Sequence, residues 1–526
     1  MKKIIIILAA LTVGFTACKK KDFSDSYADP SKISVSTVEK QYAGFLQSNW
    51  SYVVPDYWNY FVVLRTTITH YTQAVGFVNA TNQYVPGEAG IGSRWSSYYN
   101  FLAQYRELEK IYANLSDADK ALYRVYMISA AVYFYDHTQK VVDLHGDIPW
   151  SKAGMLSANG GDYTKSLPAY DGAEAIYTKM LDDLKGFSDE LSTLTVSAGV
   201  QTGFNTQDII NKGSLTMWKK YCNSLRLRIL TRVSGVSAFS ARAASEIAAI
   251  VADQAKYPLI ATNADNAQLK IYNLSSPITA NGFRTGLEDW NGNLAGKVMI
   301  DHMKANSDPR LRVIFEPGAN AAGVYLGLDP LLNSGAQTNL VNAGTLAIYN
   351  RSTLSRNQFF PGVLINAAEV SFLLSEAALK ANNLPAAKAA YEDGIRKSVE
   401  FYYYLRSISN DNTVAAPTPA TPTEVNTYIA SANINWDNAA TNAARLNLIA
   451  TQKWIHYNVV EPTETWAELR RLDLPALSFE VDNNNAQKTP PYRWLYAAGE
   501  KTYNTENYNA VSAKDNLTTK LFWDLQ

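Results

Sequence analysis

Long segments of this chain place apolar residues three and four positions apart, the spacing of one face of an α-helix. The clearest segment begins at Ser214 and ends near Val233, before Gly235, a residue type that commonly ends helices. Its apolar positions are Leu215, Trp218, Cys222, Leu225, Ile229 and Val233. The pattern predicts a mainly α-helical fold, with more than half of the ordered residues in helices and only minor strand. Cys222 is expected to be a small core residue on this stripe.

Further helices are predicted from start signals and from the same period. Ser116 with Asp119 has the form of a capping box that opens a helix over 120–140, and Asp171 with Glu174 opens another. Two helix pairs joined by short turns are predicted at 367–380 with 385–403, and at 441–457 with 462–472. Such pairs resemble tetratricopeptide units, although no strict 34-residue repeat is present. We therefore expect a tetratricopeptide-like α/α superhelical scaffold, interrupted by long irregular ligand-binding loops.

The composition excludes some classes of function and favours others. The chain has 526 residues, with 48 basic and 48 acidic ones, and a formal net charge of zero. A nucleic-acid-binding protein needs an excess of Lys and Arg to displace counterions, so nucleic acid is not expected as a partner. Hydrophobic residues make up 47% of the chain, enough for a large core, and there are 33 Tyr and 11 Trp. Such aromatic residues suit a surface that binds a neutral, hydroxyl-rich ligand.

The N-terminus has the layout of a bacterial lipoprotein signal. A short basic stretch, an apolar run over 4–13 and small residues lead directly to Cys18. This resembles the lipobox, in which the cysteine is lipidated after cleavage; the alternative is an ordinary signal peptide with an incidental cysteine. We expect a signal peptide over 1–17, lipidation at Cys18 and a polar tether over 18–40. The lipid would be the only membrane anchor, and Cys222 would then have no partner for an intramolecular disulfide.

Motifs for catalysis, metal binding and cofactor binding are weak or missing. No glycine-rich nucleotide motif, serine-hydrolase elbow or zinc-binding helix motif occurs, and no two of the five histidines have metal-ligand spacing. We therefore predict no catalytic residue, no metal site and no cofactor. The segment 143–147 could be an acid–base or hard-cation site, but a helix-end turn closed by polar side chains is favoured. Glu288-Asp289-Trp290 could be an acid beside a sugar-stacking Trp, although a glycosidase needs two carboxyls about 5–9.5 Å apart.

Several segments, in order along the chain, are similar to one known family. The segment from Trp218 to Arg228 resembles the W-x-x-x-x-N-S-L-R-L-R helix of the SusD/RagB-type lipoproteins of Bacteroidetes, in particular the second SusD-like subgroup. The further matches are Gly146–Trp150, Asp308–Leu311, Ala367–Val370 with Glu376 and Ala377, Gln452–Trp454 with Glu464, Trp466, Arg470 and Arg471, and Pro491 with Tyr492, Tyr503 and Asn504. The resemblance implies a single SusD-like α-helical domain over 41–526.

The resemblance also implies a function and a partner. Such proteins cover a SusC-like TonB-dependent outer-membrane transporter as a lid and deliver a nutrient to it, usually a glycan. This chain is therefore expected in the outer membrane, lipid-anchored and facing the cell exterior, with a glycan, peptide or other nutrient as its ligand. Most of the matching residues are expected to be scaffold: Arg226, Arg228, Arg470 and Arg471 would fix helix ends or pair with acids such as Glu369 and Glu376. A surface helical glycoside hydrolase and a purely structural scaffold remain alternatives.

Ligand contacts are expected in loops, because the helices bury their apolar stripes. Two loop-rich regions combine aromatic, amide and charged residues: 71–99 and 272–293. The predicted ligand-binding residues are Gln73, Asn82, Tyr84, Arg94 and Trp95 in the first region, and Tyr272, Arg284, Asp289, Trp290 and Asn291 in the second. A Trp beside amides and an Arg offers a sugar a flat apolar surface and hydrogen bonds at its edge. The alternative is that Tyr84, Trp95 and Trp290 only hold their own loops in place.

Overall fold

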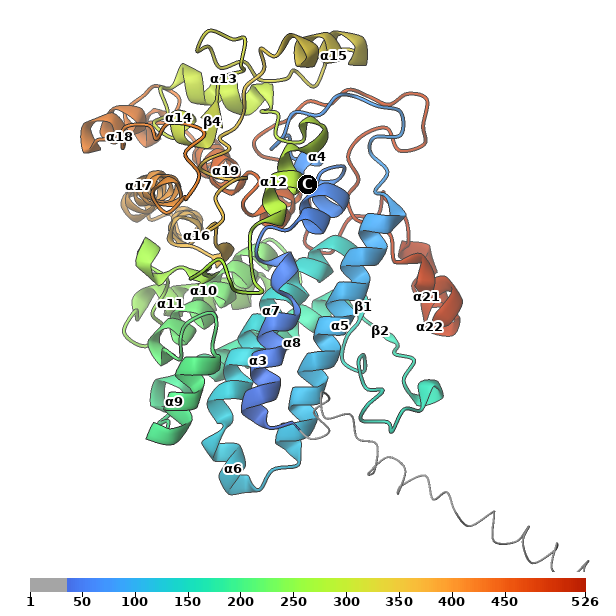
Figure 1. Cartoon of the computed structure of the whole chain (residues 1–526). Coiled ribbons are helices and arrows are strands. Elements are labelled where there is room, and N and C mark those ends of the chain that lie inside the picture. Colours follow the sequence, from blue (N-terminus) through green and yellow to red (C-terminus); the bar gives the residue numbers. More distant parts are fainter. Residues whose placement is uncertain (1–35) are drawn as a thin grey trace, which may run out of the picture.

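The computed structural model describes residues 36–526 and shows a helical molecule (Figure 1). Helices account for 56% of residues and strands for 4%. The predicted mainly α-helical fold is therefore confirmed. Residues 1–35, which include the expected signal peptide, Cys18 and most of the expected tether, lie outside the described residues. Within 36–526, no helix is both long enough and apolar enough to cross a membrane.

The first half of the chain forms a layer of long, closely packed helices. Phe45 of α3 stacks on Phe101 of α5 with ring centroids 4.5 Å apart, and Tyr105 of α5 stacks on Phe134 of α7 at 4.3 Å. Behind them, α7 packs on α8 and α10, and α10 packs on α11. The helices are α3 (Val38–Ser48), α4 (Ile68–Tyr71), α5 (Glu88–Ala113), α6 (Asp117–Leu122), α7 (Arg124–His145), α8 (Ala173–Thr193), α9 (Ala198–Gln207), α10 (Leu215–Val233) and α11 (Ser237–Ala252).

The stripe that predicted α10 lies in the core. Cys222, Leu225, Ile229 and Val233 are fully buried, and Ser214 caps the helix by accepting a hydrogen bond from the backbone N–H of Met217. The helix ends at Val233, as the period predicted. Cys222 is thus the small core residue that the sequence indicated.

The two predicted helix pairs are present in the second half of the chain. The first is α16 (Ala367–Lys380) with α17 (Leu384–Ser407), and the second is α19 (Asn442–Tyr457) with α20 (Pro462–Leu472). Asn383 caps α17, with Pro385 in its first turn, and Thr441 caps α19. A side chain at position 394 would lie within 2.5 Å of the Phe372 ring, so Gly394 is needed where α17 crosses α16. These pairs are the tetratricopeptide-like part of the scaffold.

Two predicted helix starts differ from the structure. Ser116 caps α6 as expected, but the helix breaks at Tyr123, and α7 continues from Arg124 to His145. Asp171 does not cap a helix: it lies in β2, and its carboxylate accepts hydrogen bonds from the backbone N–H groups of Trp150 and Ser151. Here a contact between distant residues outweighs the local capping signal, and α8 begins at Ala173 after Gly172.

The predicted irregular stretches contain short elements. Three two-stranded antiparallel sheets pair β1 (Ile148–Pro149) with β2 (Tyr170–Asp171), β3 (Ala267–Leu269) with β6 (Gly362–Ile365), and β4 (Phe315–Glu316) with β5 (Ile348–Tyr349). The short helices are α12 (Gly282–Glu288), α13 (Lys297–Ala305), α14 (Leu311–Ile314), α15 (Ser334–Ala343), α18 (Pro422–Ile429), α21 (Ala498–Tyr503) and α22 (Thr505–Asn509). The long loops are therefore ordered and packed against the helical scaffold.

A π-helical segment, η2 (Trp58–Leu64), follows the first helix, and α12 packs against it. Tyr60 of η2 contacts Phe283 of α12, with ring centroids 4.7 Å apart. A Cβ at position 282 would lie 2.6 Å from the backbone nitrogen of Tyr57, so Gly282 permits this close approach. The contact brings two segments together that are more than 200 residues apart in the sequence.

Candidate functional site

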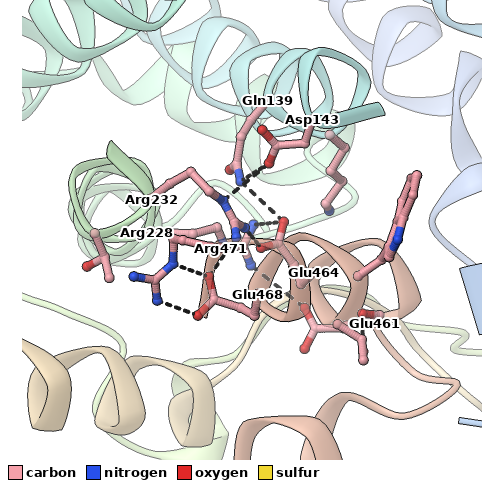
Figure 2. A network of polar contacts seen from close by, with 12 residues as sticks. Gln139, Asp143, Arg228, Arg232, Glu461, Glu464, Glu468 and Arg471 are labelled. Atoms are coloured by element: carbon pink, nitrogen blue, oxygen red, sulfur yellow. Dashed lines mark hydrogen bonds and ion pairs between the residues drawn. The ribbon is translucent and has the colours of Figure 1, made fainter. Parts of the chain in front are cut away.

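A buried network of ion pairs joins helices from both halves of the chain (Figure 2). Arg228 on α10 donates to Glu369 on α16 at 2.5 and 2.7 Å, and it contacts Asp136 on α7 at 3.1 Å. Arg471 on α20 donates to Glu376 on α16 at 2.7 Å through both terminal nitrogens. These arginines therefore pair with Glu369 and Glu376, which is one of the two roles expected from the sequence.

Arg226 and Arg470, the other two arginines expected to be scaffold, have related roles. Arg226 pairs with Glu246 of α11 at 2.5 Å. Arg470 has no carboxylate within ion-pair distance in the described chain; it donates to the backbone carbonyls of Asp143, at the end of α7, and of Tyr492, at 2.7 and 2.8 Å. It therefore fixes a helix end, the other role that the sequence suggested.

The carboxylates of the network have pKa values shifted in opposite directions. Burial alone would raise the pKa of Glu376, but Arg471, Lys380 and Lys453 outweigh burial and hold it well below its usual range. Burial raises the pKa of Glu461, and the nearby carboxylate of Glu369 raises it further. Opposed pKa values are typical of catalytic pairs as well as of structural networks. Here the charged side chains are buried between packed helices and pair with one another, which indicates a structural role.

The segment 143–147 is a helix-end turn closed by polar side chains. Asp143 accepts hydrogen bonds from the Tyr177 hydroxyl at 2.5 Å and from the Trp523 indole at 2.8 Å. The Nδ1 of His145 lies 2.8 Å from the carbonyl of Leu495, and Asp147 accepts from the backbone of Ala173 at 2.9 Å. No group of three or more His, Cys, Asp and Glu side chains in residues 36–526 is placed to hold a metal ion. The favoured interpretation of this segment agrees with the structure.

The predicted residues of the first region lie mostly inside the fold. Gln73 donates to the carbonyl of Ser478 at 2.6 Å, and the Tyr84 hydroxyl donates to the carbonyl of Glu480 at the same distance. The side chain of Asn82 is exposed, while its backbone N–H donates to Asp482 at 2.7 Å. These contacts hold the loop after α20 in place. They match the alternative in which such residues pin down their loops.

Arg94 and Trp95 are also buried, on α5. The Trp95 ring packs against His145 with centroids 5.0 Å apart, and its indole N–H donates to Glu500 at 3.3 Å. The Arg94 guanidinium lies over the Tyr52 ring, 4.8 Å from its centroid. Neither side chain is on the molecular surface, so neither is placed to contact a large ligand from outside.

The second region contains the most exposed aromatic side chain of the described residues, Trp290, at 80% exposure. Its backbone is left-handed at φ 57°, and Asn291 follows at φ 59°. Two consecutive non-glycine residues in this conformation are strained, and such strain is concentrated at functional sites. Arg65, from the C-terminal end of η2, holds the turn by donating to the carbonyl of Trp290 at 3.1 Å. Arg284 and Asp289 are exposed nearby on α12 and in the turn η5 (Asp289–Asn291).

The other predicted acid and aromatic residue of this region are placed differently. Glu288 is engaged with Arg356 at 2.8 Å and with the Ser355 hydroxyl at 2.7 Å, so it is a structural carboxylate. Tyr272 is 58% exposed, but it lies over Lys212, whose amine is 4.5 Å from the ring centroid. The structure thus brings Arg284, Asp289, Trp290 and Asn291 together, and no described contact joins Tyr272 to them.

The segment η2, which was not among the predicted ligand-binding regions, lies next to the Trp290 turn. Tyr57 and Phe61 stack with centroids 5.1 Å apart, and the Arg65 guanidinium lies 4.8 Å from the Phe61 centroid. We call Tyr57, Phe61, Arg65 and Trp290 the aromatic face. Trp58, next to Tyr57, is 47% exposed, and its indole donates to Ser93 at 2.6 Å. The signal in the sequence was the dense aromatic run over 57–61, and π-helical segments are frequent at functional sites.

Comparisons with known proteins identify the family of this chain. The model of the family SusD-like_2, described as "Starch-binding associating with outer membrane", matches residues 38–497. No curated protein matches the chain. Among solved structures, a chitin-binding SusD homologue from Flavobacterium johnsoniae is 24% identical, with a TM-score of 0.70, and covers 92% of this chain and 99% of its own.

Two further solved structures show the same fold. A chitin-binding protein is 22% identical with a TM-score of 0.72, covering 92% of this chain and 100% of its own. A SusD homologue from Bacteroides fragilis is 20% identical with a TM-score of 0.72, covering 93% and 100%. These identities support a shared fold, and the family model extends over most of the chain. The protein therefore belongs to the SusD-like family of nutrient-binding proteins associated with the outer membrane.

Proposed function

We propose that this protein is a lipid-anchored receptor on the outer face of the outer membrane, which binds an oligosaccharide at the aromatic face and delivers it to a SusC-like TonB-dependent transporter. The observation that carries the proposal is Trp290, a tryptophan with 80% exposure on a strained turn that Arg65 supports. A fold that holds a large apolar side chain outward at a conformational cost has a use for it on the surface. The family's description as starch-binding supports a sugar ligand.

The chemistry around Trp290 suits a sugar ring. The indole offers a flat apolar surface for the C–H face of the ring, and Tyr57 and Phe61 extend the aromatic surface along η2. Arg284, Asp289 and Asn291 are exposed beside it and supply donors and acceptors for hydroxyl groups. Because two of the similar structures are chitin-binding proteins, chito-oligosaccharides are the first ligands to test, together with starch-derived oligosaccharides.

The test is a binding measurement on the soluble chain lacking the signal peptide and Cys18. A glycan array identifies the ligand, and calorimetry then compares the wild type with Trp290→Ala. Stacking on an aromatic ring is worth about 1–3 kcal/mol, by analogy with nucleobases, so affinity should fall about tenfold or more. Tyr163→Ala is the matched control, because Tyr163 is an aromatic residue 72% exposed on the loop between β1 and β2. Equal affinity of Trp290→Ala and wild type would reject the proposed site.

The same preparation tests the two alternative functions. A surface glycoside hydrolase would release shorter products from the bound oligosaccharide, which chromatography detects. Glu288, the partly buried acid of the candidate catalytic segment, is already paired with Arg356, which lowers its pKa despite partial burial. A general acid needs the opposite shift. A purely structural scaffold would show no saturable binding to any glycan or peptide on the array.

A further inference from the structure

A small polar cavity lies against η2. Its volume is about 60 Å³. Apolar side chains of η2, Tyr60 and Val63 among them, form one wall. The charged residues of the lining and Trp494 come from four separate segments: Arg94 of α5, Lys140 of α7, Glu461 and Glu464 at the start of α20, and Trp494; Asn59 and Thr463 also line the cavity. Arg94 was predicted from the sequence to bind a ligand, and this cavity is where the structure places it.

Several polar groups that line the cavity lack partners within the described chain. Arg94 is 6% exposed, and its Nη1 is buried without a hydrogen-bond acceptor in residues 36–526. The indole nitrogen of Trp494, which is fully buried, also has no acceptor there. Oε1 of Glu461 has no hydrogen-bond donor in the same residues, and it lies 3.7 Å from Arg228. Among the described residues, Lys140 forms an ion pair with one carboxylate, that of Asp136, at 3.0 Å. Buried polar groups are normally satisfied, so a cluster of them around one cavity indicates a ligand.

The charge of Arg94 is the strongest of these indications. Burial lowers the pKa of Arg94, the ionisable groups that act on it are the hydroxyls of Tyr52, Tyr98 and Tyr133, and no carboxylate of residues 36–526 forms an ion pair with it. A buried guanidinium without a counter-ion is costly, whereas pairing with an anion in a bidentate geometry offsets much of the cost. Glu464, the other acid in the wall, is already paired with Arg232 at 2.5 Å.

We propose that this cavity binds a small monovalent anion of the size of formate, acetate or a halide, held by Arg94, Lys140 and the indole N–H of Trp494. The two lining nitrogens that have no partner within residues 36–526, those of Arg94 and Trp494, are both donors, which favours an anion over a cation. Burial and the neighbouring carboxylate of Glu369 raise the pKa of Glu461, which weakens the repulsion that an anion would meet from this acid. A volume of about 60 Å³ admits a molecule of a few non-hydrogen atoms, since a single water needs about 10–15 Å³ on this measure. The proposal does not depend on the glycan function.

The direct test uses bromide as the probe. Crystals of the soluble chain, soaked in bromide, should show an anomalous scattering peak within contact distance of the Arg94 guanidinium and of Lys140. A cavity that contains only water, with bromide bound elsewhere on the surface, would overturn the proposal. Because this measurement uses the wild-type protein, it decides the question even if variants of Arg94 fail to fold.

The second test is thermal unfolding at constant pH and ionic strength. The Tm of the wild type should be higher in sodium acetate than in sodium gluconate, whose anion is too large for the cavity. This difference in Tm should reach a plateau as the acetate concentration rises. The expected rise is about 2–3 °C at a hundredfold excess over the Kd. Arg94→Met removes the charge and keeps much of the side-chain length, so it should lose the difference between the two salts. An equal acetate response in wild type and Arg94→Met would contradict the assignment.

Discussion

The buried network should be most sensitive at Glu376. This side chain is fully buried, and it accepts from both terminal nitrogens of Arg471 at 2.7 Å and from Lys453 at 3.3 Å, with Lys380 at 2.9 Å. Glu376→Gln keeps the shape of the side chain and removes its charge. Arg471 and Lys453 would then share Glu468 alone, a carboxylate that Arg232 already contacts at 2.6 Å.

The expected loss of stability in Glu376→Gln follows from the removal of one charge from a buried ion network. Removing one partner and leaving the other charges buried costs about 3–5 kcal/mol. At about 2.1 cal/mol/K per residue, unfolding a chain of roughly 500 residues has an entropy near 1 kcal/mol/K. Glu376→Gln should therefore lower the Tm by about 3–5 °C. Scanning calorimetry at neutral pH measures this shift.

The control is Asp301→Asn, the same kind of change in an exposed pair. Asp301 contacts Lys297 at 2.7 Å, but both side chains are more than 40% exposed, and such pairs contribute about 0–1 kcal/mol. The pKa of Glu376 is lowered in the folded protein, so its contribution is complete above its ordinary value of 4.5 and is lost as the pH falls below it. The difference between wild type and Glu376→Gln should shrink accordingly in acid. Equal Tm shifts for the two variants at neutral pH would refute this account.

Three further predictions concern the protonation of Glu461, the lipidation of Cys18 and the transporter partner. The pKa of Glu461 is raised in the folded protein, so the folded state binds an extra proton above pH 4.5 and loses stability as the pH rises. The variant Glu461→Gln can still accept a hydrogen bond from Asn366, and its Tm at pH 8 should equal or exceed that of the wild type. A Tm several degrees lower than that of the wild type would contradict this. Cys18→Ser should abolish incorporation of labelled fatty acid, and equal labelling would exclude lipidation at Cys18. The chain should co-purify with a TonB-dependent transporter from detergent-solubilised membranes, because a lid of this kind buries more than about 2,000 Å²; repeated recovery of the chain alone would count against that partner.

The helices were predictable because their signals are local. The stripe of α10, the turn between α16 and α17, and the caps Ser214 and Thr441 lie within a few residues of the structure they specify. Asp171 shows the limit of local signals. Its carboxylate had the spacing of a helix cap, but it accepts hydrogen bonds from the chain at 150–151, twenty residues earlier. Nothing in the spacing of residues around 171 reveals that contact.

The candidate site was predictable only in part, because exposure is decided by contacts between distant segments. Tyr84 and Trp290 both lie in loop-rich regions with similar composition. The loop after α20 folds over Tyr84 and buries it, whereas the turn of Trp290 is held from behind through its backbone, so its side chain stays outside. The contribution of η2 depends on its packing against α12, which the sequence does not indicate. A predicted binding residue in such loops needs its exposure measured before its chemistry is interpreted.

The residues that identify the family and the residues that face the proposed ligand are different sets. Arg228, Glu369, Glu376 and Arg471 belong to the segments that match the family, and all four are buried in the ion network between helices. Membership of the family is therefore recognised from scaffold residues, which constrain how the helices pack and do not determine the ligand-binding loops. Trp290 lies outside those matching segments, in a turn supported by a single arginine. The ligand of this protein must accordingly be established from measurements at that turn, since a shared fold does not determine the ligand.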